Sequence, residues 1–293
     1  MQRMTLFITD ELAGRKVESI LHNEFAMSVS YISRLKRRPF GITLNGQKAY
    51  TTAITAEGDK LSAEIGDPED YVRALPMEAE LCVPWQDEFI AIIDKAAGMA
   101  VHQSTRDPNE LTLENAFAAR FPAGENFHPV SRLDRGTTGL MTVAKSGYMH
   151  ERLKRLLHTD MFKREYIGIA EGKFAKMEDR IELPIGMAEG SSYKRAIMED
   201  GVPALTEYKV LYARGDVTVL RLIPNTGRTH QLRLHMAAIG HPLSGDWLYG
   251  NRRQDIARPA LHSAELWLTH PISGDALHLT SPLPEDMKRL ITE

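Results

Sequence analysis

Short apolar runs typical of β-strands outnumber helical stripes in this chain, and the two kinds do not alternate strictly. The strand-like runs lie at residues 89–93, 140–144, 166–170 and 217–223. The helical stripes of the same region lie at residues 113–121 and 149–157. A parallel, doubly wound sheet would require regular alternation of strand and helix. We therefore expect an α+β fold in which helices flank a mixed, largely antiparallel sheet.

The N-terminal region combines two further helical stripes with a hairpin signal. Thr9 or Asp10 can cap a first helix, whose apolar residues are Leu12, Val17, Ile20, Leu21 and Phe25. Ser28 or Ser30 can open a second helix, which leaves a basic cluster near its exposed end, formed by Arg34, Lys36, Arg37 and Arg38. The dipeptide Asn45-Gly46 predicts a β-hairpin, followed by a strand at residues 60–65.

The chain of 293 residues is long enough for two domains. Residues 66–76 are rich in turn formers and acids, which is typical of a linker. We predict a small N-terminal domain at residues 1–66, a linker at 67–80 and a larger domain at 81–293.

Composition excludes several classes of protein. No apolar run approaches the roughly 20 residues of a membrane span, and the first residues lack the order of a secretory signal, so we expect a soluble, cytoplasmic protein. Cys82 is the only cysteine, which excludes internal disulfides and thiolate-cluster metal sites. The spacing of the histidine pairs His150/His158 and His230/His235 does not match a metalloprotease helix, and we expect no metal.

The net charge of −3 does not by itself favour nucleic-acid binding. Screening confines electrostatic reach to about 8 Å at physiological salt, so local clusters matter more than the total. Besides the cluster after Ser30, a second basic cluster consists of Arg152, Lys154, Arg155, Lys163 and Arg164. Each cluster alone is also compatible with an ordinary solvated face.

One carboxylate lies in a distinctive turn sequence. Asp134 is flanked by Arg132 and Arg135 within residues 128–139, and glycines and hydroxyl residues that favour a tight turn follow it. An acid among arginines is expected to be ionised. Taken alone, Asp134 could equally form an ordinary loop salt bridge with either neighbouring arginine.

A predicted helix a hundred residues later supplies a partner for this acid. Thr229 is a plausible N-cap, Gly240 and Pro242 are a stop signal, and one apolar stripe is formed by Leu232, His235, Met236 and Ile239. Arg233 lies just off this stripe, so it can reach a carboxylate on a neighbouring strand while the helix stays packed on the core. We predict that Arg233 pairs with Asp134.

These stretches resemble the RluA-type pseudouridine synthases, which isomerise uridine in RNA. The resemblance follows the family's own order through ordered blocks over roughly the last two thirds of the chain, at residues 95–102, 128–139, 164–172, 225–235, 240–246, 261–262 and 281–284. The N-terminal region looks like an S4-type RNA-binding module, although a plain αβ packing unit is the alternative.

The resemblance implies a role for each matched residue. Asp134 would be the essential carboxylate, and Arg233 would keep it ionised. Arg132 would act in base flipping, Tyr166 would stack on the target base, and Leu261 would line the uracil pocket. The basic residues Arg34, Lys36, Arg37, Arg38, Arg152 and Arg155 would contact RNA. The reaction needs no cofactor and no metal, and we expect a monomer that acts on structured RNA, with ribosomal RNA favoured over transfer RNA.

Two departures from the family pattern keep alternatives open. Ser131 occupies the position where a histidine commonly precedes Arg-Leu-Asp, and Ala96-Ala97 replaces the usual Pro-Ala after Lys95. The departures put in doubt any transfer of target-site specificity. A catalytically silent RNA-binding or assembly factor of the same fold is one alternative, and an RNA N-glycosidase that releases free uracil is a weaker one.

Overall fold

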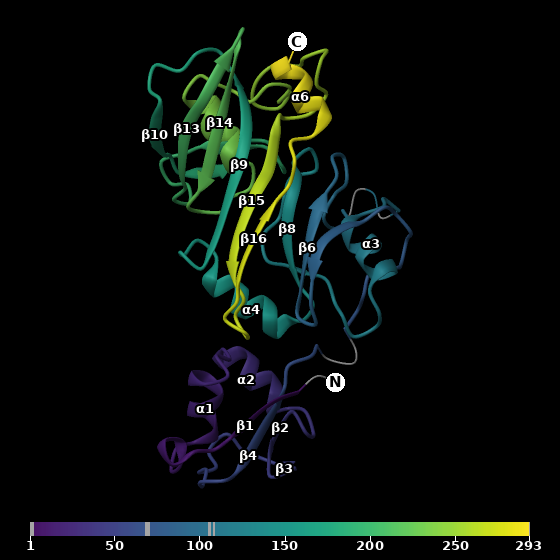
Figure 1. The fold of residues 1–293 in the computed structure, drawn as a ribbon, viewed down its shortest axis with the longest axis vertical. Coiled ribbons are helices and arrows are strands. Elements are labelled where there is room, and N and C mark those ends of the chain that lie inside the picture. Colours follow the sequence, from purple (N-terminus) through teal and green to yellow (C-terminus); the bar gives the residue numbers. More distant parts are fainter. Residues whose placement is uncertain (1–2, 68–70, 105–106, 108, 293) are drawn as a thin grey trace.

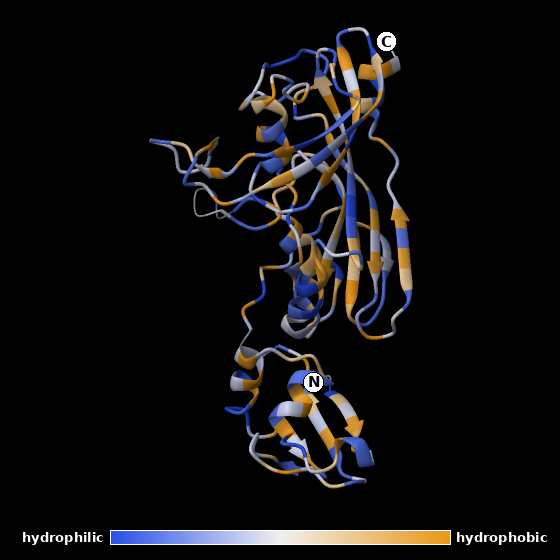
Figure 2. Ribbon diagram, turned by 90° about the vertical axis from the view of Figure 1, so that its left-hand side faces the viewer, coloured by the Kyte–Doolittle hydropathy of each residue, from blue (hydrophilic) through white to orange (hydrophobic). Residues whose placement is uncertain are grey.

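The protein folds into a small and a large sheet-and-helix unit (Figure 1), and the structure, a computed structural model, describes residues 3–67, 71–104, 107 and 109–292. The small unit comes first in the chain and lies at one end of the large unit, as Figure 2 shows in a view turned by 90°. In the same view apolar and polar residues alternate along the strands, as expected for sheets with one or both faces packed.

The small unit is a four-stranded antiparallel sheet covered by two helices. Its strand order is β1-β4-β2-β3, and the strands are β1 (Arg3–Phe7), β2 (Ile42–Leu44), β3 (Gln47–Lys48) and β4 (Lys60–Glu64). The hairpin expected at Asn45-Gly46 is confirmed, because β2 and β3 pair across it. Strand β1 was not predicted.

The first helix of the small unit begins later than the sequence suggested, whereas the second begins where it was predicted. A short 3-10 turn covers Asp10–Leu12, and the first helix, α1, spans Val17–Asn23 with Lys16 as its N-cap. The expected cap at Thr9 or Asp10 was therefore wrong, because the chain is extended at Ala13 and left-handed at Gly14, which separates the turn from the helix. Helix α2 (Val29–Leu35) begins as predicted, since the Ser28 hydroxyl accepts from the Tyr31 amide.

The large unit is built on a ten-stranded sheet, which confirms the predicted mixed, largely antiparallel architecture. The order along it is β10-β13-β14-β9-β15-β8-β6-β5, with β16 paired to β15 and β7 to β8. Among the paired strands described, only β15 and β8 run parallel. The strands are β5 (Cys82–Gln86), β6 (Ile90–Lys95), β7 (His128–Pro129), β8 (Thr138–Ala144), β9 (Phe162–Glu171), β10 (Glu178–Glu182), β13 (Leu205–Arg214), β14 (Val217–Pro224), β15 (Leu261–Thr269) and β16 (Ala276–Thr280).

Helices and a small hairpin complete the large unit. The predicted helices appear as α3 (Leu113–Arg120), α4 (Gly147–Leu156) and α5 (Gln231–Ala238). Helix α6 (Glu285–Thr292) and the hairpin of β11 (Ile185–Met187) and β12 (Arg195–Ile197) were not predicted. No helix among the described residues is long and apolar enough to cross a membrane.

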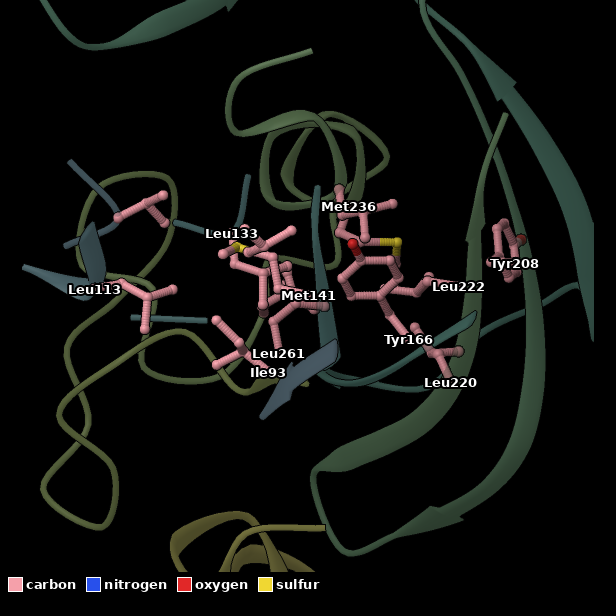
Figure 3. Packing of buried hydrophobic residues seen from close by; sticks show 14 of the residues in the cluster. Ile93, Leu113, Leu133, Met141, Tyr166, Tyr208, Leu220, Leu222, Met236 and Leu261 are labelled. Carbon is pink, nitrogen blue, oxygen red and sulfur yellow. The ribbon is translucent and has the colours of Figure 1, made fainter. Parts of the chain in front are cut away.

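The main hydrophobic cluster joins α5 to the centre of the sheet. Tyr166 of β9, Leu261 of β15 and Met236 of α5 are all buried in this cluster, together with Leu133 from the loop before β8 (Figure 3). Because these side chains come from four separate segments, packing of the core fixes the relative positions of the residues around Asp134.

The small unit packs on helix α4. Tyr148 is 1% exposed and belongs to the hydrophobic cluster of the small unit, and its hydroxyl donates to the Phe25 carbonyl at 2.8 Å. Arg152 donates to the carbonyls of Phe25 at 3.3 Å and Pro271 at 2.6 Å. Arg155 donates to the Ala26 carbonyl at 3.1 Å. These contacts hold the small unit against one end of the large sheet.

Removal of the Tyr148 ring should weaken this contact. We expect Tyr148→Ala to lower the free energy of unfolding by about 3–5 kcal/mol, because truncation of a buried aromatic side chain leaves a cavity. Urea unfolding followed by circular dichroism measures the change. Tyr212→Ala is the matched control, since Tyr212 is 47% exposed and its loss should cost less than about 1 kcal/mol. Equal losses in the two variants would contradict the assigned packing role.

Candidate active site

Asp134 lies in a tight turn that leads into β8. The Thr137 amide donates to the Asp134 carbonyl at 3.0 Å, and the Gly98 amide donates to the Arg135 carbonyl at 2.9 Å. Gly139 adopts φ +104, and a side chain there would collide with the backbone of Ser263 on β15. This glycine lets β8 and β15 approach closely, so the turn before β8 lies beside the start of β15.

The start of α5 differs from the expectation. Its N-cap is His230, which adopts φ 59 and makes no side-chain cap, so the prediction of Thr229 was wrong. Instead the Gln231 side chain closes the turn before the helix, since its oxygen accepts from the Thr226 hydroxyl at 2.7 Å and the Arg228 amide at 3.0 Å. The rest of the predicted helix is confirmed, and its end coincides with Gly240 at φ +88.

The predicted contact between Arg233 and Asp134 is present. Nη1 of Arg233 lies 3.2 Å from Oδ2 of Asp134, and the Asp134 side chain remains 25% exposed. Neither neighbouring arginine takes this place in the described structure, since Arg135 instead pairs with Glu110 at 2.8 Å. The ordinary loop salt bridge considered for Asp134 is therefore replaced by a partner from α5.

A second carboxylate holds Arg233 more tightly than Asp134 does. Asp246 is fully buried, and its two oxygens accept from Nε and Nη2 of Arg233 at 2.7 and 2.8 Å. Burial opposes the charged guanidinium, but the hydrogen bonds and charges of Asp246 and Asp134 outweigh it and raise the pKa of Arg233. This bidentate pair fixes the guanidinium plane, so that the remaining nitrogen points to Asp134.

The Tyr249 ring packs against the guanidinium plane of Arg233. The guanidinium carbon lies 5.3 Å from the ring centroid, which is within the range of a cation–π contact. The Tyr249 hydroxyl accepts from the Arg195 amide and lies 2.9 Å from Nδ1 of His230. Burial is the main cause that lowers the pKa of His230, so its imidazole is neutral near pH 7.

Asp246 and Tyr249 were missed as site residues. The sequence signal was present, because the matched block at residues 240–246 ends on Asp246, but no role was assigned to that acid. Lys95 was also quoted without a role. It is 1% exposed, and its ammonium donates to the carbonyls of Ala96, Met99 and Arg135 at 2.8, 3.0 and 3.1 Å. Lys95 therefore ties the Asp134 turn to the loop after β6.

The five residues predicted for the reaction line one cavity of about 850 Å³, namely Arg132, Asp134, Tyr166, Arg233 and Leu261. This volume lies within the range of roughly 300–1,000 Å³ that is usual for ligand pockets. Tyr166 and Leu261 are only 5% and 4% exposed, so they form the floor, whereas Arg132 is exposed at the rim. The cavity combines an apolar floor with the accessible carboxylate of Asp134 and several cations.

The basic residues expected to contact RNA fall into two groups. Lys36 and Arg37 are exposed on the small unit, whereas Arg34 pairs with Glu151 at 3.2 Å and Arg38 with Glu64 at 3.0 Å. Arg152 and Arg155 donate to backbone carbonyls at the contact between the units. Within the described residues no group of three or more potential ligands could hold a metal ion.

Comparison with known proteins places this geometry in a family. A model of the RNA pseudouridylate synthase family matches residues 90–238. The chain is 33% identical over 270 residues to the Bacillus subtilis protein named uncharacterized RNA pseudouridine synthase YjbO, covering 92% of this chain and 95% of that protein. It is 37% identical to ribosomal large subunit pseudouridine synthase D of Nitrosomonas europaea, over 77% of this chain and 67% of that one.

Solved structures give the same answer. Human RNA pseudouridylate synthase domain containing 1 superposes with a TM-score of 0.57 at 27% identity, covering 69% of this chain and 83% of that chain. The α+β fold is therefore that of a known class of RNA-modifying enzyme. The chain belongs to the RNA pseudouridine synthase family.

The buried lysine gives the folded protein a distinctive pH dependence. Burial lowers the pKa of Lys95 from the ordinary 10.5 to about 8. Between these two pH values the unfolded chain holds a proton at this site that the folded chain has released, so the free energy of unfolding should rise with pH. Relative to Lys95→Met, the wild type should gain roughly 3 kcal/mol between pH 8 and 10.5.

Urea unfolding of both proteins at several pH values measures this difference. The comparison with Lys95→Met cancels the titration of the other groups that the two proteins share. A stability difference that stays constant across this range would show that Lys95 is not held as a desolvated cation.

Proposed function

We propose that this enzyme isomerises uridine to pseudouridine in ribosomal RNA of the large subunit, with Asp134 as its essential carboxylate. The observation that carries the assignment is the position of Asp134, which is accessible in the cavity and paired at 3.2 Å with a buried arginine. Such a pairing favours the ionised form of the acid when RNA displaces water from the site. The relatives named as large-subunit enzymes support the choice of RNA.

The reaction needs one reactive group and a dry site. The bond between C1′ of the ribose and N1 of uracil breaks, the base turns, and C1′ bonds to C5, while C5 loses a proton and N1 gains one. The balance requires no cofactor. Asp134 acts on the nucleoside by attack at C1′ or C6 or by removal of a sugar proton, and each of these roles requires an ionised carboxylate.

The cavity walls supply the other functions. The Tyr166 ring forms a face on which the displaced uracil can stack, and Leu261 closes the pocket beside it. Arg132 stands at the exposed rim two residues before Asp134, where it can fill the place that the flipped uridine leaves in its helix. Arg132 therefore acts on the RNA, whereas Arg233 acts on the Asp134 carboxylate.

The small unit is proposed to bind RNA as an S4-like domain at residues 1–66, joined by a linker at 67–80 to a catalytic domain at 81–293. The exposed Lys36 and Arg37 at the end of α2 support this role, because phosphate contacts require accessible cations. The contacts of Arg152 and Arg155 with the small unit suggest that these two residues orient the domain more than they touch RNA.

Replacement of Asp134 tests the chemical assignment. Asp134→Asn should form no detectable pseudouridine while it remains folded and binds RNA, because the amide keeps the shape of the side chain but cannot act as a nucleophile or base. Primer extension after chemical adduct formation, on RNA from cells with the gene deleted and complemented, gives the readout. Asp216→Asn is the matched control, since Asp216 is exposed and pairs with Arg253.

Other outcomes separate the competing functions. Full activity of the Asp134 variant would reject the catalytic assignment. RNA binding without any change in pseudouridine content on deletion would support a silent assembly factor, and release of free uracil, seen by chromatography, would support an N-glycosidase. A modified site in transfer RNA alone would leave the chemistry in place and overturn the choice of ribosomal RNA.

Replacement of Arg132 tests base flipping. We expect Arg132→Ala to lower the rate on a base-paired uridine roughly 10- to 100-fold more than on the same uridine in an unpaired strand, because unstacking costs a few kcal/mol that the guanidinium offsets. Rates on matched paired and unpaired transcripts measure this ratio. Arg135→Ala, on the other side of Asp134, should affect the two RNAs alike. An equal effect of Arg132→Ala on both would assign it to phosphate binding instead.

A further inference from the structure

A second cavity of about 470 Å³ lies on the other side of Asp134. It shares Asp134, His230 and Arg233 with the larger cavity, so the two hollows meet at the carboxylate. Its remaining wall includes the rings of Tyr193 and Trp247. The roles assigned above to Tyr166, Leu261 and Arg132 use none of this space.

Trp247 is held in an exposed position by a rigid turn. Its indole is 50% exposed, while Asp246 next to it is fully buried. The turn is fixed because Asp246 accepts from the amides of Leu248 and Tyr249 at 3.1 and 3.3 Å, and because Gly245, at φ +74, leaves no room for a side chain beside Arg258. The same carboxylate thus fixes the guanidinium at Asp134 and the backbone that presents the indole.

The surroundings of the indole suit a nucleotide of RNA. Arg252 is exposed, and its guanidinium carbon lies 6.0 Å from the centroid of the Trp247 ring, so positive charge accompanies the aromatic face. Lys194 follows Tyr193 of the smaller cavity in the chain and is likewise exposed, with its ammonium 5.9 Å from the Tyr249 ring. An aromatic platform beside cations is the combination that stacks a base and neutralises its phosphate.

We propose that the smaller cavity is a binding subsite for the nucleotide next to the target uridine, whose base stacks on Trp247. The inference rests on the proposed function, since it places the target uridine in the larger cavity. An RNA strand that passes from the larger cavity to the smaller one at Asp134 would bring the neighbouring base next to the Trp247 indole. Trp247 therefore contributes to the affinity and specificity of RNA binding, and it does not touch the reacting atoms.

Kinetics on a short transcript that carries the mapped uridine test the subsite. Trp247→Ala should raise KM about 5- to 150-fold with little change in kcat, which is the weakening expected from loss of one base–aromatic stack. Trp247→Phe should recover most of the affinity because it keeps an aromatic face. Trp267→Ala is the matched control, since that ring stacks on His278 outside both cavities and its loss should leave KM unchanged.

Fluorescence gives a readout that a purely structural role would not move. The chain has three tryptophans, so Trp85→Phe combined with Trp267→Phe leaves Trp247 as the only indole. Its emission should be quenched when the transcript binds. An unquenched indole, an unchanged KM in Trp247→Ala, or a spectral change that follows protein concentration instead of RNA would each overturn the subsite. If the wild type forms no pseudouridine in any RNA, the proposed function fails, and the subsite fails with it.

Discussion

The bidentate pair between Arg233 and Asp246 is the interaction on which the arrangement around Asp134 depends. A buried ion pair is stable only when its geometry is good and its remaining hydrogen-bonding groups are satisfied. Here the Asp246 oxygens accept from two backbone amides as well as from the guanidinium, and the Tyr249 ring covers the arginine. The orientation of the guanidinium is therefore fixed independently of Asp134, and the Asp134 carboxylate remains accessible to a nucleoside.

Strand pairing brings the rest of the cavity to this point. In the antiparallel pair of β9 and β15, Tyr166 lies opposite Ser263 and Leu261 lies opposite Gly168, so the two floor residues are neighbours. In the parallel pair of β15 and β8, His262 lies opposite Thr138, four residues after the acid. Register in the sheet, more than contacts among the site residues themselves, determines which side chains share the cavity.

Local patterns in the sequence predicted local geometry well, and partner choice less well. The apolar stripe of α5 correctly predicted that Arg233 points off the packed face of the helix. The turn sequence around Asp134 correctly identified the acid that Arg233 contacts. The preference of Arg233 for Asp246 could not be predicted, because it depends on a turn at residues 245–250 that packs closely against the backbone of Arg258, 13 residues after Gly245. Lys95 was missed for the same reason, since two of its three carbonyl partners lie outside its immediate neighbours. Strand β1 is short and half exposed, so its pattern gave little signal.

The place of β15 in the sheet sets an order of assembly. This strand comes late in the chain, yet it lies between β9 and β8 and is the only described strand that joins the two halves of the sheet. The hydrogen bond between the side chains of Thr138 and His262 spans 124 residues, so the sheet closes through contacts of very high sequence separation. During synthesis the strands on either side of β15 keep exposed edges until β15 has been made and can pair with both β9 and β8. A nascent chain therefore cannot form the complete cavity around Asp134 until the ribosome has synthesised β15, which carries Leu261.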